Sequence, residues 1–83
     1  MLENNGAYMR QVIQISIFKG VEYYVAEGVN IPLVTQGKTY DELFYNLKEA
    51  LILFLEDEDL SKYDIQANPA IIANLELNNI LYA

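Results

Sequence analysis

The chain has 83 residues, 53% of them hydrophobic, with no cysteine, no histidine and a net charge of −7. This length allows one small domain with a barely sufficient core, and the missing residue types exclude disulfides, thiol chemistry and the commonest catalytic base. Twelve acidic against five basic residues disfavour direct binding to nucleic acid. The acidity favours a basic protein partner, or it serves only to keep an ordinary domain soluble.

The N-terminal part of the chain predicts a leader and a first strand. Residues 1–8 contain neither a basic region nor an apolar run, so we expect a short flexible leader and no signal peptide. From residue 10 onward apolar and polar residues alternate, which predicts a half-buried strand that ends in a hairpin turn at Gly20. The apolar side of this strand carries Ile13, Ile15 and Ile17.

Two further strands are expected before the only long helix. Residues 22–27, EYYVAE, are rich in aromatic residues and apolar on both faces, which predicts a central strand. Tyr23 and Val25 would share the face of this strand that lies opposite the helix. Residues 33–36, LVTQ, predict a short third strand that leads into the helix.

The helix is expected over residues 37–56. Thr39 and Glu42 have the spacing of a capping box, in which the threonine hydroxyl accepts from the helix and the carboxylate accepts from the threonine amide. The acidic run 56–59 opposes the helix dipole and should end the helix, as solvated charge and not as a metal site. An apolar stripe at three-and-four spacing should pack on the isoleucine side of the sheet. This stripe consists of Leu43, Leu47, Ala50, Leu51 and Phe54.

The C-terminal part predicts a loop, a fourth strand and an arm. Residues 60–68 are typical of a loop, with one turn held by Tyr63 or Ile65. Residues 70–77 alternate again and predict the fourth strand, and residues 78–83 form an apolar C-terminal arm.

The expected order of elements is β-β-β-α-β. Hairpins join the first three strands, so the third strand runs parallel to the first. A right-handed crossover through the helix then places the fourth strand parallel to the first and beside it. We therefore expect one domain over residues 1–83, with a two-layer α+β fold, sheet order 3-2-1-4 and the helix on one face.

The sequence contains no recognisable catalytic, metal-binding or cofactor-binding constellation. Ser16 and Ser61 have no histidine to activate them, and the four glycines are scattered singly, so no phosphate-binding loop is predicted. Seven tyrosines without a basic groove favour packing and interface roles over stacking on bases. The longest apolar run, residues 50–55, is too short to span a bilayer. We expect a cytoplasmic protein that is not an enzyme and needs no cofactor.

Three segments, YYVAE, VTQGKTYDEL and NLKEAL, lie within residues 12–56. Together they resemble the N-terminal domain of the HicB family of antitoxins. The resemblance implies a partial, catalytically inactive RNase H-like fold of the same β-β-β-α-β order. It also implies a function in binding and neutralising a small basic RNA-cleaving toxin. In this family a separate C-terminal domain usually binds operator DNA.

Two features depart from the family pattern. The chain ends at Ala83 without a DNA-binding domain, and residues 28–34, GVNIPLV, lack the Pro-Gly-Cys character often found at this connection. Both departures predict a stand-alone HicB-like form whose toxin partner the sequence does not specify. The alternative function is a stand-alone oligomeric structural domain with an unrelated partner.

Two sets of residues are candidates for interactions. Acidic residues that would attract a basic partner are Glu22, Glu27 and Asp41. Apolar residues that one layer of packing cannot cover predict a homodimer or a higher homo-oligomer. These apolar residues are Tyr23, Val25, Ile52, Leu53, Leu55, Ile80, Leu81 and Tyr82.

Overall fold

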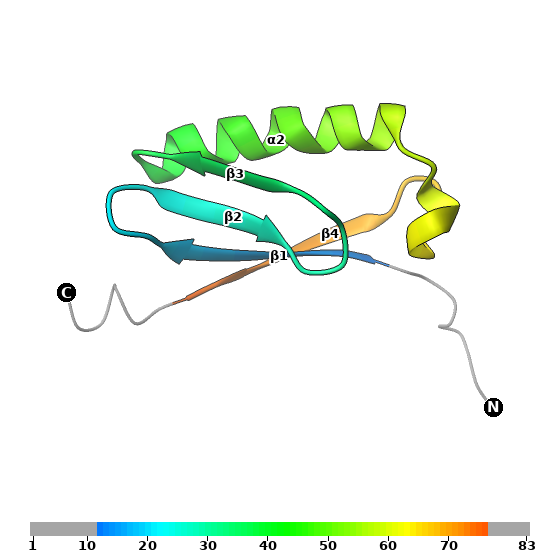
Figure 1. Ribbon diagram of the computed structural model, residues 1–83, viewed down its shortest axis with the longest axis horizontal. Coiled ribbons are helices and arrows are strands. Elements are labelled where there is room, and N and C mark those ends of the chain that lie inside the picture. The colour runs from blue at the N-terminus through cyan, green and yellow to red at the C-terminus, as the bar shows by residue number, and fades with distance from the viewer. Residues whose placement is uncertain (1–11, 77–83) are drawn as a thin grey trace.

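The computed structural model describes residues 12–76, which form four strands and two helical segments (Figure 1). In chain order these are β1 (Val12–Lys19), β2 (Tyr24–Gly28), β3 (Val34–Gly37), the α-helix α2 (Tyr40–Asp57), the 3₁₀-helix η1 (Leu60–Tyr63) and β4 (Ala70–Leu75). The leader and the C-terminal arm expected from the sequence lie outside the described residues.

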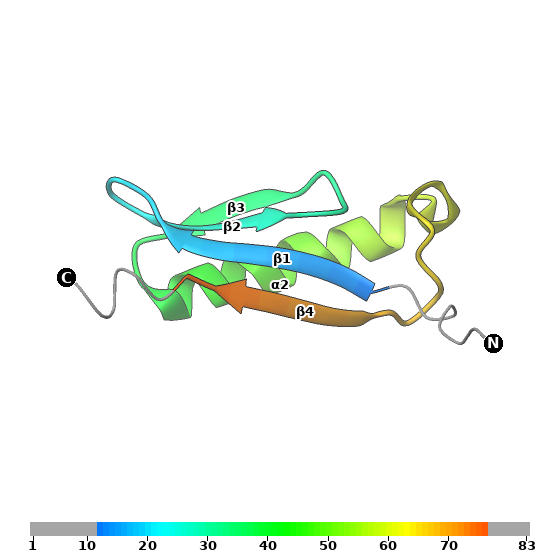
Figure 2. The same cartoon turned by 90° about the horizontal axis from the view of Figure 1, so that it is seen from below.

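The four strands form one mixed sheet in the order β3-β2-β1-β4. The pairs β1–β2 and β2–β3 are antiparallel, and β4 is parallel to β1. The helix α2 lies along one face of the sheet, and Figure 2 views the molecule from the opposite face. The α+β architecture, the β-β-β-α-β order and the strand order 3-2-1-4 predicted from the sequence are therefore confirmed.

Two strands begin later than the sequence predicted, because turns occupy their first residues. The Gly20 amide donates a hydrogen bond to the Tyr23 carbonyl at 2.7 Å, so Glu22 and Tyr23 belong to the hairpin turn and not to β2. The next connection closes in the same way, because the Gly28 amide donates to the Leu33 carbonyl at 2.7 Å. The third strand consequently starts at Val34.

The helix begins with the predicted cap, but with one different partner. The Thr39 hydroxyl accepts from the Glu42 amide at 3.1 Å, as the capping box requires. The Glu42 carboxylate accepts from the Lys38 amide at 2.6 Å and not from the Thr39 amide. The predicted hydrogen bond from the Thr39 amide to the Glu42 carboxylate was therefore wrong by one residue, because the carboxylate reaches past Thr39 to the amide of Lys38.

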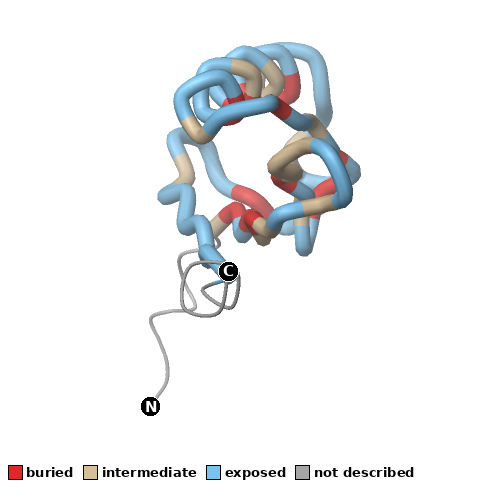
Figure 3. The backbone as a smooth tube through the Cα atoms, turned by 90° about the vertical axis from the view of Figure 1, so that its left-hand side faces the viewer, coloured by how far each residue is buried: buried red, intermediate tan, exposed pale blue. Residues whose placement is uncertain are grey.

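The core lies between α2 and the sheet, where the buried residues in Figure 3 face one another. The three isoleucines of β1 are at most 2% exposed, as the alternation predicted. The stripe of α2 is buried too, except Ala50, which is only half-buried. Its members Leu43, Leu47, Leu51 and Phe54 share one hydrophobic cluster with Ile13, Ile15 and Ile17.

The segment after α2 is more ordered than a simple loop. The helix ends at Asp57, where the Glu58 amide donates to the Phe54 carbonyl, so the acidic run terminates the helix as expected. Asp59 then caps η1 by accepting from the Ser61 amide and hydroxyl, at 3.2 and 2.7 Å. Tyr63 packs on Phe54 with 5.4 Å between ring centroids, and Ile65, only 5% exposed, adds a buried anchor. The connection to β4 is therefore held against the end of α2.

Candidate functional site

The strand β4 is the least covered strand within residues 12–76. All six of its residues are exposed, although the register places Ile71, Ala73 and Leu75 beside the buried isoleucines of β1 and on the same side of the sheet. Ile71 and Leu75 are 43% and 41% exposed. The backbone of α2 approaches β3 and β2 closely but makes little contact with β4. Among the described elements, α2 therefore leaves its side of β4 without a second layer.

A groove of about 290 Å³ lies between α2 and β4. Its lining is apolar apart from Lys48. The remaining lining residues are Phe44, Leu47, Leu51, Ile52, Leu55 and Ile71. An exposed apolar patch of this kind usually marks a surface that binds a protein or a ligand.

The structure separates the apolar residues that the sequence assigned to an oligomer interface. Ile52 and Leu55 line the groove, whereas Leu53 is 58% exposed and does not line it. Val25 lies opposite Phe18 on the sheet face away from α2, and Tyr23 lies in the hairpin turn. Ile80, Leu81 and Tyr82 lie outside the described residues.

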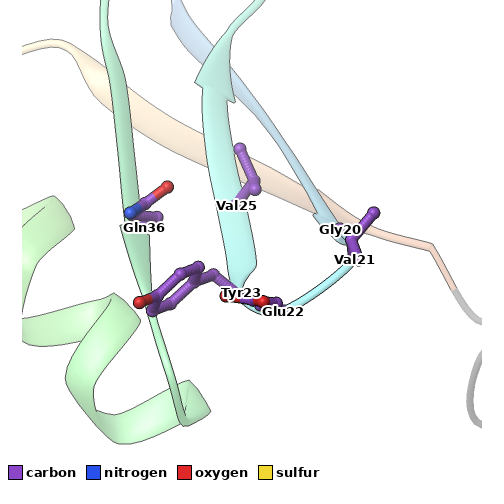
Figure 4. Close-up of a pocket in the computed structure, with 6 residues that line it drawn as sticks. All are labelled: Gly20, Val21, Glu22, Tyr23, Val25 and Gln36. Atoms are coloured by element: carbon purple, nitrogen blue, oxygen red, sulfur yellow. The ribbon is translucent and has the colours of Figure 1, made fainter.

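A second hollow, of about 360 Å³, lies beside the β1–β2 hairpin (Figure 4). It brings together Glu22, Tyr23 and Val25, which the sequence had assigned to two different interfaces. Gly20, Val21 and Gln36 complete its lining. Figure 4 shows the Tyr23 ring reaching from the hairpin turn toward β3. The hollow is open and holds one carboxylate, which is too few groups for acid–base chemistry between paired carboxylates.

The three acidic residues predicted to attract a partner do not form one cluster. Glu22 lies in the hairpin turn, at the end of the sheet where α2 begins (Figure 1), and Asp41 lies in the first turn of α2. Glu27 lies near the other end of β2, opposite Ser16 and Val34, on the sheet face away from α2. All three are exposed, so each contributes to the surface potential without building a common site.

A more continuous acidic surface runs along the outer side of α2. Glu42, Glu49 and Glu56 are all exposed, and their seven-residue spacing places them in one line along the helix. The exposed acidic run 57–59 begins at the last residue of α2 and continues past the end of the helix. We call these residues the acidic ridge. The sequence interpretation did not name it as a partner surface, although the spacing of the three glutamates within the predicted helix was sufficient to find it.

The titratable groups of the described chain do not converge on a reaction centre. Within residues 12–76 no three carboxylates are arranged so that they could hold a metal ion. Hydrogen bonds from the Ser61 hydroxyl and amide lower the pKa of Asp59 below its ordinary value, with a smaller contribution from Lys62. This shift follows from the cap of η1 and not from catalytic tuning. No helix in this part of the chain is long and apolar enough to cross a membrane.

Comparisons of the chain with protein-family models, with curated proteins and with solved structures find no match. The resemblance to the HicB family therefore stays a prediction from the sequence motifs. The observations that bear on function are the acidic ridge on one side of α2 and the apolar groove on its other side.

Proposed function

We propose that this chain is a non-catalytic interaction module that binds a small basic protein and neutralises it. The HicB-type antitoxins that it resembles act in this way on an RNA-cleaving toxin. The single observation that carries the proposal is the acidic ridge, with Glu42, Glu49 and Glu56 in line and the run 57–59 at its end. Aligned and exposed carboxylates attract a basic surface over a long distance and orient it before contact.

The absence of a reactive constellation is consistent with this role. A protein that blocks another needs contact area and complementary charge, and it needs no nucleophile, metal or acid–base pair of its own. Of the ridge residues, Glu42 also holds the start of α2 through the Lys38 amide, so its charge has a fixed position. Glu49 and Glu56 make no hydrogen bond within the described residues that would compete with a partner.

The test is a capture experiment with the full chain as bait, at low and at high salt. We expect a small basic protein that is retained at low salt and released at high salt, because exposed charges are screened by ions. Inducible expression of the captured protein should stop growth and cleave RNA, and co-expression of this chain should relieve both effects.

Two double variants, each of which neutralises two carboxylates, test which surface of this chain binds the basic partner. Glu49→Gln with Glu56→Gln removes two charges from the ridge, whereas Glu22→Gln with Glu27→Gln removes two charges from the hairpin and the opposite sheet face. We expect the first pair to slow association several-fold and the second pair to change it little. Recovery of nucleic acid only, or of a basic protein that neither stops growth nor cleaves RNA, would refute the proposed function.

A further inference from the structure

We infer that the bare edge of β4 and the groove beside it bind a second copy of this chain, by antiparallel pairing of the two β4 strands. The inference rests on the backbone of β4, on the side chains around the groove and on the distribution of charge. It does not require a basic partner, because the acidic ridge and the groove are different surfaces of α2.

The backbone of β4 directs hydrogen-bonding groups away from the sheet. The Glu76 amide donates to the Ile17 carbonyl at 2.9 Å, and backbone groups point to alternate sides along a strand. Residues 70, 72, 74 and 76 therefore bond to β1, whereas Ile71, Ala73 and Leu75 direct their amides and carbonyls outward. Within residues 12–76 no strand lies on that side and no side chain bonds to these groups.

The strand also lacks the features by which proteins protect an edge. Natural edge strands are short, bulged, or interrupted by lysine or proline, which discourages pairing with another chain. The sequence of β4, AIIANL, contains six residues with no charge and no proline. Its β-branched residues Ile71 and Ile72 favour the extended conformation that a new strand would need.

Two copies of β4 are complementary to each other. Opposite residues of an antiparallel pair share one face of the sheet, so the odd-numbered residues of one copy must oppose the odd-numbered residues of the other. A register centred on Ala73 sets Ile71 against Leu75 of the second copy and forms about six hydrogen bonds. The two-fold axis is then perpendicular to the sheet. Both helices consequently lie on the same side of the joined sheet, and the two grooves face each other across the paired β4 strands.

Charge selects a second copy over a basic partner at this edge. Each copy carries a net charge of −7, so two copies repel each other least where carboxylates are absent. The strand carries no charge, and the groove lining carries only Lys48. The carboxylate nearest to this edge along the chain is that of Glu76, just past the end of the strand, so the edge offers a basic protein little charge to bind. Removing the exposed apolar side chains of Phe44, Ile52 and Leu75 from water would instead stabilise a pair of copies.

Proline substitutions on the two edges test the strand pairing. The outward amide of Ala73 is not bonded to β1, so Ala73→Pro should keep the fold and remove one donor from each copy, which is two of the about six hydrogen bonds of the new pairing. The matched control is Val34→Pro on the β3 edge. Its amide also points outward, because the neighbouring Leu33 carbonyl bonds to β2. Sedimentation equilibrium at low micromolar concentration should give twice the 9.5 kDa mass for the parent and for Val34→Pro, and 9.5 kDa for Ala73→Pro.

Adjacent helix positions test the groove without altering any strand. Ile52 lines the groove and its neighbour Leu53 does not, although both are exposed. Ile52→Glu places a carboxylate in the contact, whereas Leu53→Glu adds the same charge outside it. We expect Ile52→Glu to weaken self-association at least tenfold and Leu53→Glu to leave it within a factor of about two.

Other occupants of the β4 edge would give different results in these measurements. A monomeric parent overturns the inference. If the parent is monomeric but a form ending at Glu76 dimerises, the edge belongs to residues 77–83 of the same chain. A dimer that survives both Ala73→Pro and Ile52→Glu uses another surface and also overturns the inference. In a dimer of the inferred kind, the amides of Ile71, Ala73 and Leu75 exchange with solvent more slowly as protein concentration rises.

Discussion

The two edges of the sheet differ in whether their outward backbone groups have hydrogen-bond partners. At the β3 edge, the Asn46 side chain of α2 donates to the outward carbonyl of Gln36 at 2.8 Å. Where β2 no longer covers β1, the Asn30 side chain bonds to the Gln14 amide and the Val12 carbonyl. Within the described residues nothing comparable covers β4. Residues 12–76 therefore satisfy the exposed backbone at one side of the sheet and leave it open at the other.

The size of the elements explains why one edge stays bare. A helix is about 10 Å wide, whereas four strands spaced about 4.8 Å apart form a broader surface. One helix therefore covers two or three strands. Because α2 starts directly after β3, its first turns are fixed to that side, with Gly37 packed against the backbone of Leu43. Among the described elements, the β4 edge is therefore the one that the helix does not cover.

The largest expected contrast is between two leucines on the two sides of the molecule. Leu43 is fully buried beside β3, and Leu75 is 41% exposed on β4. Leu43→Ala should lower the free energy of unfolding by about 2–5 kcal/mol, which approaches the whole stability of so small a domain. Leu75→Ala should lower it by about 1 kcal/mol or less, since little buried volume is lost.

Urea unfolding followed by circular dichroism measures both leucine variants, at a protein concentration low enough to keep self-association from adding stability. Equal losses for Leu43→Ala and Leu75→Ala would mean that β4 is covered in solution and that the contrast between the edges does not hold.

An intermediate effect is expected at Gly37, where β3 and α2 approach each other closely. A Cβ atom at Gly37 would lie 2.4 Å from the Leu43 amide nitrogen and 2.8 Å from its Cα, and neither backbone atom can move freely. Gly37→Ala should therefore cost about 1–3 kcal/mol through overpacking. The matched control is Gly20→Ala in the hairpin, where the nearest atom is the Tyr23 carbonyl oxygen at 3.1 Å. A thermal melt should show the larger loss for Gly37→Ala, and the reverse order would contradict the close packing of β3 and α2.

The smallest expected effect concerns η1, which joins α2 to the open side. Hydrogen bonds from Ser61 hold the pKa of Asp59 below its ordinary value. The folded state therefore favours the carboxylate. Its stabilising contribution is present above the pKa of an unfolded aspartate and is lost as pH falls through the lower folded value. An NMR titration of the Asp59 carboxyl should show this low midpoint, and Ser61→Ala should return it toward the ordinary value. No change on Ser61→Ala would show that the hydroxyl does not cause the shift.

The sequence determined the features that depend on neighbouring residues. Alternation in β1 and the three-and-four spacing in α2 identified the two buried surfaces, because a side chain's direction follows from its position in a strand or helix. Thr39 and the acidic run 56–59 marked the ends of the helix, because capping and dipole effects act within one turn. From these elements the short hairpins and the right-handed crossover fixed the strand order.

Only the tertiary structure decided which surfaces stay open. The alternation of β4 shows that Ile71, Ala73 and Leu75 share a face, but not that α2 fails to reach it, because coverage depends on where the helix lies over the sheet. Likewise, Ile52 and Leu53 are adjacent apolar residues in the sequence, and only the position of α2 beside β4 places one in the groove and the other outside it. Local pattern fixes which way a side chain points, whereas the arrangement of the layers fixes what it meets there.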